Sequence, residues 1–161
     1  MTIKVGDTVP SATFRVMTAE GPKPKTTDDV FKGKKVAIFA VPGAFTPTCS
    51  NLHIPSFLRN LDAFKAKGVD TVAVISVNDP FVMKEWAKAS GSDGKIDFLA
   101  DGNAEFTKAA GMDFDGSGAG LGVRSKRYSM FVDNGTVKQL NVEDGPGKCD
   151  ISGGEALLGQ I

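Results

Sequence analysis

The sequence predicts an α/β domain in which helices flank a central mixed β-sheet. Continuous apolar runs at 36–41 and 71–77 are typical of strands that are covered on both faces, as in a parallel sheet. The segment between them has apolar residues at helical spacing, so the three segments form a βαβ unit. An Asn-Gly pair at 134–135 lies between two more strand-like runs, which is the strongest short signal for a β-hairpin.

The composition is that of one globular domain, spanning 1–161. Apolar residues make up 41% of the chain and charged residues 24%, and no apolar run reaches the ~20 residues of a membrane helix. Nineteen basic residues balance nineteen acidic ones, so bulk charge predicts neither a nucleic-acid partner nor a membrane partner. Two cysteines and one histidine are too few for a structural zinc site, which takes about four ligands. The first seven residues lack the features of a signal or transit peptide, so we expect a cytoplasmic protein.

The first third of the chain surrounds the first buried strand. Residues 12–16 alternate in polarity and predict a short edge strand, and residues 28–33 predict a helical turn that ends at a glycine. After the strand at 36–41, apolar side chains recur at helical spacing as far as Gly68, which supplies the stop. Pro55 lies inside this helix and should kink it or divide it into two segments.

The middle of the chain gives weaker signals. After the strand at 71–77, Asn78-Asp79-Pro80 predicts the start of a helix with proline near its first position. Residues 98–100 predict a short strand, and residues 103–110 predict a short helix that is capped by its first residue or by the glycine before it. The tract 111–122 is rich in glycine and predicts a loop, since no nucleotide-binding glycine pattern fits it.

The last third completes the fold. Residues 127–133 and 136–142 are the two strands of the predicted hairpin, and 152–161 predict a helix that is capped by its first residue, with Glu155 at the third position. The order βαβα, an irregular insertion, ββ and α is that of the thioredoxin-like architecture. In that fold the working cysteine follows the first strand of the βαβ unit, at the start of its helix. Cys49 is in that position.

Cys49 lies at a position where the backbone can make a thiol reactive. If Thr46 caps the helix and Pro47 is its first residue, Cys49 lies in the first turn, near unpaired backbone N–H groups and the positive end of the helix dipole. Both features favour a thiolate over a thiol. The alternative is a small buried hydrophobe, the usual fate of a free cysteine. The neighbours Thr48 and Ser50 are hydroxylic rather than apolar, which favours a nucleophile.

The segment from Pro42 to Cys49, Pro-Gly-Ala-Phe-Thr-Pro-Thr-Cys, resembles the PxxxTxxC active-site signature of peroxiredoxins. The form Pro-Gly-Ala-Phe-Thr-Pro-x-Cys is similar to that of the type II (peroxiredoxin-5-like) branch. The resemblance extends over most of the chain, through residues 5–10, 77–83 and 126–130. It implies a thiol peroxidase that reduces hydrogen peroxide and organic hydroperoxides, in antioxidant defence, without a metal or a bound cofactor.

The resemblance also implies roles for individual residues. Cys49 matches the peroxidatic cysteine, which attacks the peroxide O–O bond and becomes a sulfenic acid. Thr46 matches the residue whose hydroxyl orients the peroxide, and Pro42 matches the proline that shields the thiolate from water. Arg127 matches the arginine beside the cysteine, whose charge stabilises the thiolate and polarises the peroxide. Arg124 is a weaker candidate for the same pocket.

His53 lies one helical turn after Cys49, on the same face. A Cys-His dyad like that of a protease is conceivable, but the base of such a dyad normally comes from a separate element. We therefore interpret His53 as a residue that packs behind Cys49 or supports it from a second layer.

The role of Cys149 decides how the Cys49 sulfenic acid is reduced back to a thiol, and the sequence leaves that role open. Some type II enzymes carry a resolving cysteine in this region, which forms an internal disulfide, but Cys149 is offset from where that cysteine aligns. It is therefore either a resolving cysteine or a bystander. Relatives without a resolving cysteine use glutathione, glutaredoxin or thioredoxin as the reductant. Relatives are also commonly homodimers, and the resemblance suggests Phe45, Pro80 and Phe81 as interface residues.

Two other function classes fit the same fold. A thioredoxin-fold disulfide exchanger is disfavoured because no second cysteine lies within CxxC distance of Cys49. A non-catalytic peroxide sensor, in which oxidation of Cys49 only signals, differs from a peroxidase in its rate of peroxide consumption rather than in its sequence.

Overall fold

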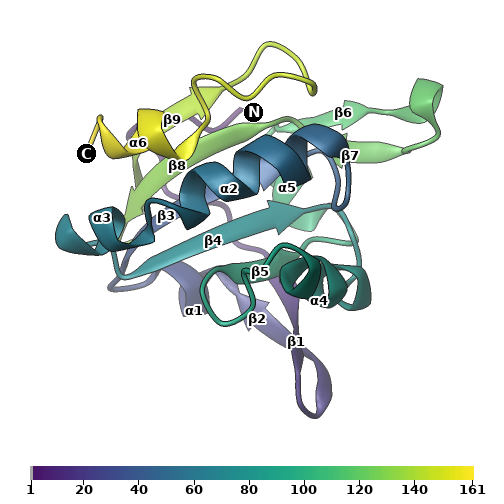
Figure 1. Ribbon diagram of the computed structural model, residues 1–161, viewed down its shortest axis with the longest axis horizontal. Coiled ribbons are helices and arrows are strands. Elements are labelled where there is room, and N and C mark those ends of the chain that lie inside the picture. Colours follow the sequence, from purple (N-terminus) through teal and green to yellow (C-terminus); the bar gives the residue numbers. More distant parts are fainter. Residues whose placement is uncertain (1) are drawn as a thin grey trace.

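The computed structural model describes residues 2–161, and a seven-stranded mixed sheet of order β2-β1-β5-β4-β3-β8-β9 organises them (Figure 1). The strands of this sheet are β1 (Thr13–Thr18), β2 (Gly21–Thr26), β3 (Lys35–Val41), β4 (Thr71–Ser76), β5 (Asp97–Ala100), β8 (Tyr128–Asp133) and β9 (Thr136–Val142). The helices are α1 (Thr27–Phe31), α2 (Ile54–Leu58), α3 (Leu61–Ala66), α4 (Pro80–Ala89), α5 (Glu105–Ala109) and α6 (Gly154–Leu158). This is the predicted mixed sheet between helices, and the thioredoxin-like fold is confirmed.

The central strand β3 separates two apolar cores. It pairs in parallel with β4 and antiparallel with β8. Because side chains alternate along a strand, Val36, Ile38 and Ala40 enter one core together with residues of α1 and α5. The other face of β3 carries Phe39 and Val41 into the second core, with residues of α2, α3, α4 and α6. Cys49 belongs to this second core.

The N-terminal prediction was wrong in one respect. β1 is not at the edge of the sheet, because it pairs with β2 on one side and with β5 on the other. The edge strand is β2, whose sequence Gly-Pro-Lys-Pro-Lys-Thr does not look like a strand. Proline is tolerated on an edge strand, where one row of N–H groups needs no partner. The helical turn predicted at 28–33 is present as α1, which ends before Gly33, a glycine with φ +70°.

The segment between β3 and β4 is divided, as Pro55 predicts. The helix starts at Pro47 and widens at η1 (Cys49–His53), a π-type turn in which the N–H of Ile54 donates to the Cys49 carbonyl. Pro55 follows in the first turn of α2. Proline has no N–H and crowds the carbonyl four residues earlier, and a wider turn before it relieves that crowding. Such turns are frequent at functional sites.

The insertion before β8 is more ordered than predicted. The tract predicted as a loop contains β6 (Asp113–Asp115), which pairs antiparallel with β7 (Val123–Ser125) in a hairpin that projects from one end of the molecule (Figure 1). A short 3-10 turn, η2 (Ser117–Ala119), lies at its tip. The cap of α5 was also predicted wrongly, since the carboxylate of Asp101 accepts the N–H groups of Phe106 and Thr107.

The C-terminal hairpin is confirmed, and the predicted cap of the last helix is not. β8 and β9 meet at Asn134 and Gly135, which have φ +47° and +81°, as a two-residue turn with positive φ at both positions requires. α6 begins after Gly153 without a side-chain cap. The Ser152 hydroxyl donates to Glu143 instead, and Glu155 pairs with Arg59. Within residues 2–161, no helix has the length and apolar character needed to span a membrane.

Candidate active site

The Cys49 thiol is fully buried at the start of the helix that follows β3. Two polar groups contact its sulfur: the Thr46 Oγ1 atom at 2.8 Å and the Arg127 Nη2 atom at 2.9 Å. Thr46 comes from the turn between β3 and the helix, and Arg127 directly precedes β8, the antiparallel neighbour of β3. The strand pairing thus brings together two residues that are 78 positions apart. A hydroxyl and a guanidinium that converge on one sulfur can both donate hydrogen bonds to negative charge on it.

The Thr46 hydroxyl has one proton and two neighbours. Its Oγ1 atom lies 2.7 Å from the Gly43 carbonyl and 2.8 Å from Cys49 Sγ. When Cys49 is a thiol, S–H can donate to Oγ1 while the hydroxyl donates to Gly43. When Cys49 is a thiolate, the hydroxyl proton can turn to the sulfur. In residues 2–161 no N–H of the first helical turn donates to this hydroxyl, so the predicted side-chain cap is absent, although Pro47 is the first helical residue.

Arg127 is fixed by acceptors on several sides. It is 2% exposed, and its Nε and Nη2 atoms both donate to the Pro146 carbonyl, at 3.2 and 3.0 Å. Its Nη1 atom lies 2.9 Å from His53 Nδ1. Because a guanidinium only donates, His53 Nδ1 must accept. The donors of the planar guanidinium are therefore committed to the Pro146 carbonyl, the imidazole and the sulfur, which leaves the guanidinium one orientation.

His53 is a neutral imidazole of known tautomer. Since Nδ1 accepts from Arg127, the proton is on Nε2, which donates to the Ser152 carbonyl at 2.9 Å. The ring is fully buried and packs on Phe39, with ring centroids 4.7 Å apart. Burial, and next the Arg127 charge, lower the pKa of His53 to about 3. A base that is already blocked by Arg127 cannot deprotonate Cys49, so His53 supports Arg127 rather than forming a protease-like dyad.

We expect acid to destabilise the protein through His53. In the unfolded chain this side chain titrates near 6.5, so between pH 6.5 and 3 the unfolded state binds more protons and the folded state loses stability as the pH falls, by about 1.4 kcal/mol per pH unit. The loss is about 2 kcal/mol at pH 5. Urea unfolding at pH 7 and pH 5 measures it, with His53→Gln as the variant that should lack this component. His53 is the single histidine, so its NMR signal is unambiguous, and a titration between pH 5 and 8 would refute the assignment.

Pro42 and Arg124 meet at the turn that follows β3. Pro42 is buried at the end of β3, and its carbonyl accepts from Arg124 Nη1 at 3.1 Å. Arg124 Nε donates to the Leu121 carbonyl at 3.0 Å, so this guanidinium ties the β6–β7 hairpin to the turn after β3. Gly43 makes the approach possible, because a Cβ there would collide with the Arg124 guanidinium. Arg124 therefore holds the Pro42-Gly43 turn, and within residues 2–161 it makes no hydrogen bond to Cys49.

Cys149 is a half-buried free thiol in the long loop between β9 and α6. Burial raises the pKa of this thiol, although the nearby Arg127 charge opposes the rise. It is thus held as a thiol in the neighbourhood of the site. No disulfide joins it to Cys49 in the structure.

The predicted interface residues are on the surface. Phe45 is 53% exposed and Phe81 63% exposed, whereas Pro80 is half-buried at the start of α4. Phe45 has φ +65°, a left-handed conformation that a bulky side chain adopts only when its surroundings impose it. The turn that delivers Thr46 to the sulfur imposes it here.

Sequence reasoning missed the groups of the loop after β9. The Pro146 and Ser152 carbonyls and the Glu143 carboxylate all belong to the polar network around Arg127. A backbone carbonyl has no sequence signal, because every residue carries one. Glu143 follows a strand within a polar turn and reads as a surface charge, but it is 8% exposed.

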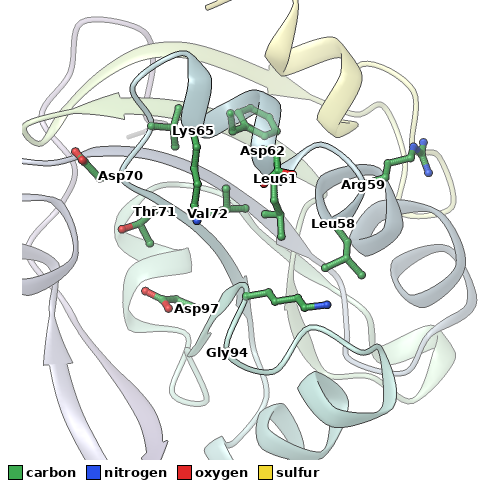
Figure 2. Close-up of a pocket in the computed structure, with 13 residues that line it drawn as sticks. Leu58, Arg59, Leu61, Asp62, Lys65, Asp70, Thr71, Val72, Gly94 and Asp97 are labelled. Carbon is green, nitrogen blue, oxygen red and sulfur yellow. The ribbon is translucent and has the colours of Figure 1, made fainter.

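A cavity of about 550 Å³ lies elsewhere, between α3 and the ends of β4 and β5 (Figure 2). One arginine and two lysines alternate along the sequence with three aspartates in its lining, and neither Cys49 nor Arg127 lines it. A smaller cavity of about 250 Å³ is lined by Arg127, Phe114, Lys126 and residues 142–146. In residues 2–161, no group of three or more His, Cys, Asp and Glu side chains could hold a metal ion.

Comparison with known proteins gives consistent matches over nearly the whole chain. The Redoxin family model matches residues 4–158. Peroxiredoxin-2C of Oryza sativa subsp. japonica is 46% identical over 97% of this chain and 96% of its own. The crystal structure of reduced Prx3 from Vibrio vulnificus in complex with hydrogen peroxide is 48% identical, with a TM-score of 0.93 over 99% of both chains. Peroxiredoxin 5 from Alvinella pompejana is 39% identical, with a TM-score of 0.85 over 97% of this chain and 96% of its own.

Proposed function

Because the chain belongs to the type II branch of the peroxiredoxins, which are thiol peroxidases of the redoxin family, we propose that Cys49 is the residue that attacks the peroxide. The observation that supports this most is the convergence of Thr46 and Arg127 on a buried sulfur, at 2.8 and 2.9 Å. The same donors can stabilise negative charge on the sulfur before the reaction and on the leaving oxygen during it.

The proposed chemistry is a displacement at oxygen. The Cys49 thiolate attacks one peroxide oxygen, the S–O bond forms, and the O–O bond breaks. The departing alkoxide or hydroxide takes up a proton, so one peroxide yields one alcohol or water and one sulfenic acid. Arg127 and Thr46 would share their donors between the sulfur and the peroxide oxygens. Hydrogen peroxide and small organic hydroperoxides fit the proposal best, because Cys49 has no exposed surface.

A stoichiometry experiment tests the role of Cys49. Without a reductant, one equivalent of hydrogen peroxide should be consumed per chain, and mass spectrometry should find the added oxygen on Cys49 and not on Cys149. The Cys49→Ser variant serves as the blank. Wild-type protein that consumes peroxide no faster than free glutathione would end the proposal, and so would oxidation that is confined to Cys149.

We further propose that an external thiol restores Cys49. A first thiol displaces water from the sulfenic acid and forms a mixed disulfide, and a second thiol releases Cys49 and leaves with the first as a disulfide. Glutathione with glutaredoxin, or thioredoxin, can supply these thiols. Cys149 is a poor resolving thiol in this conformation, because burial raises its pKa and keeps it protonated. A buried Cys49 also requires the first helical turn to open before a protein thiol can reach it.

We expect that Cys149 takes no part in the reduction of the Cys49 sulfenic acid. After one equivalent of peroxide, the wild-type protein should show a sulfenic acid at Cys49 and no Cys49–Cys149 disulfide in non-reducing mass spectrometry. Cys149→Ser should turn over within about twofold of wild type with glutathione and glutaredoxin. A predominant internal disulfide, together with loss of turnover in Cys149→Ser, would instead make Cys149 the resolving cysteine. Running the thioredoxin system in parallel identifies the preferred reductant.

The oligomeric state and location are proposals of the same kind. Exposed Phe45 and Phe81 favour a homodimer packed near the site, since large exposed aromatic side chains are enriched at interfaces. Light scattering measures this, and a monomer at micromolar concentration would contradict it. The cytoplasmic location stays a prediction from the N-terminal sequence.

A further inference from the structure

The loop between β9 and α6, residues 143–153, which we name the strap, supplies two of the acceptors that hold the site (Figure 1). The Pro146 carbonyl receives both the Nε and the Nη2 donors of Arg127. The Ser152 carbonyl receives the Nε2 proton of His53, whose other nitrogen accepts from Arg127. The orientation of Arg127 therefore depends, directly and through His53, on where the strap lies.

Packing alone does not fix the first half of the strap. Residues 143–146 line the cavity of about 250 Å³ beside Arg127. An added Cβ at Gly145 or Gly147 would meet no atom within 4 Å, so both glycines face open space. A loop with glycines and a cavity beside it has many conformations of similar energy. Polar contacts must select one of them.

Glu143 makes the contacts that close the strap. One oxygen of its carboxylate, Oε2, accepts three hydrogen bonds: from the Asp150 N–H at 2.7 Å, the Ser152 N–H at 2.8 Å and the Ser152 hydroxyl at 2.7 Å. These bonds join the first residue of the strap to its far end. The Glu143 N–H donates to the Arg127 carbonyl at 3.0 Å, which ties Glu143 directly to the backbone of Arg127. Three bonds to one buried carboxylate oxygen are strong, charge-assisted contacts.

The surroundings of Glu143 also favour its negative charge. Burial alone would raise the pKa of this carboxyl, but the hydrogen bonds from Ser152 and Asp150 and the nearby Arg127 charge lower it, so it stays ionised at neutral pH. A buried guanidinium needs negative charge nearby. Glu143 provides it without bonding to the donors that Arg127 directs at Cys49 and Pro146.

We propose that Glu143 is a positioning residue for peroxide reduction: it closes the strap so that the Pro146 and Ser152 carbonyls hold Arg127 and His53 in the orientation that serves Cys49. The inference rests on the proposed role of Cys49 and Arg127, because Glu143 acts only through Arg127. It touches neither the sulfur nor the peroxide.

A double-mutant cycle on the oxidation rate tests the proposal. Trp86 is the single tryptophan, and its indole N–H donates at 3.0 Å to the hydroxyl of Ser50, the residue after Cys49, so its fluorescence should report oxidation in a stopped-flow mixer. The rate constant with hydrogen peroxide is measured for wild type, Glu143→Ala, Arg127→Ala and the double variant. We expect Glu143→Ala to slow oxidation about tenfold in the wild-type background and less than twofold in the Arg127→Ala background. A merely structural loss would be equal in both.

Two further variants make the outcome decisive. Asp144→Ala removes the same charge from the next, exposed residue of the strap and should stay within twofold of wild type. Glu143→Gln keeps an acceptor oxygen and should recover most of the oxidation rate. If Glu143→Ala does not fold, Glu143→Gln takes its place in the double-mutant cycle. Its smaller decrease in the oxidation rate must then disappear in the Arg127→Ala background. Equal losses in both backgrounds, or an unchanged Glu143→Ala rate, overturn the proposal. A slow wild type would instead indicate failure of the proposed function.

Discussion

Replacing Arg127 with alanine should slow the oxidation of Cys49 by hydrogen peroxide about 10²–10³-fold. The substitution removes the Nη2 donor that lies 2.9 Å from Sγ, and with it the fixed positive charge that favours the thiolate. It also leaves the Nδ1 atom of buried His53 and the Pro146 carbonyl without their donors. The rate constant from stopped-flow peroxide consumption measures the effect, and circular dichroism checks that the fold is kept.

Two comparisons separate the charge of Arg127 from its shape. Arg127→Lys keeps the charge, but one ammonium group cannot serve the sulfur, the imidazole and the strap carbonyl from one plane, so we expect it to remain at least about tenfold below wild type. Lys126→Ala removes the exposed cation next in sequence and should change the rate less than twofold. If Arg127→Ala falls within twofold of wild type, or if Lys126→Ala is equally slow, Arg127 has no specific role at the sulfur.

The predictable part of the fold is the part whose signal is local. The apolar runs of β3 and β4 and the Asn134-Gly135 turn fix their own conformation, and the structure has them where the sequence predicts them. β2 was missed because Gly-Pro-Lys-Pro-Lys-Thr has no strand propensity, and only pairing with β1 makes it a strand. The side chain that binds the first turn of α5 was missed because Asp101 lies before the predicted start of that helix. The predicted Ser152 cap of α6 is absent because Ser152 gives its hydroxyl to Glu143.

The residues of the site also fall into those that a local sequence pattern predicts and those that it does not. Cys49 and Thr46 are three residues apart on one turn, so sequence spacing alone brings them together. Arg127 could be chosen over Arg124 only by resemblance. Arg124 lies in β7 and Arg127 directly before β8, and only the folded structure shows that the Arg127 guanidinium reaches the sulfur while that of Arg124 reaches the Pro42 carbonyl. The acceptors that orient Arg127 are backbone carbonyls and a buried carboxylate from the strap. Their positions follow from the path of the whole C-terminal segment, which no local pattern encodes.

The C-terminal segment is thus part of the site as well as of the fold. α6 packs on α2 through Leu157 in the second core, and the Gly154 N–H donates to the Ser56 hydroxyl at 2.9 Å. The strap enters α6 directly, so the position of α6 sets the position of the Ser152 carbonyl at His53. A displacement of α6 must therefore reach Arg127 through the imidazole.

We expect Gly154→Ala to destabilise the protein by about 3 kcal/mol, near the upper end for overpacking, and to slow peroxide reduction in the fraction that stays folded. A Cβ at Gly154 would overlap the Ser56 carbonyl group, with the Ser56 carbonyl carbon at 2.6 Å and the Phe57 nitrogen at 3.0 Å. These are backbone atoms of α2, so no side chain can turn aside, and one helix has to move. Urea unfolding measures the loss of stability.

A second glycine of the same segment provides the control. Gly159 ends α6 with φ −70°, and an added Cβ would stay 3.6 Å from the Glu155 carbonyl oxygen, which is ordinary contact. Gly159→Ala should therefore leave the free energy of unfolding unchanged or raise it by up to about 1 kcal/mol, because alanine restricts the unfolded chain. Equal stabilities of the two variants would mean that α6 can shift freely on α2. The Ser152 carbonyl could then not depend on this contact for its place at His53, and the oxidation rate of Gly154→Ala would match that of wild type.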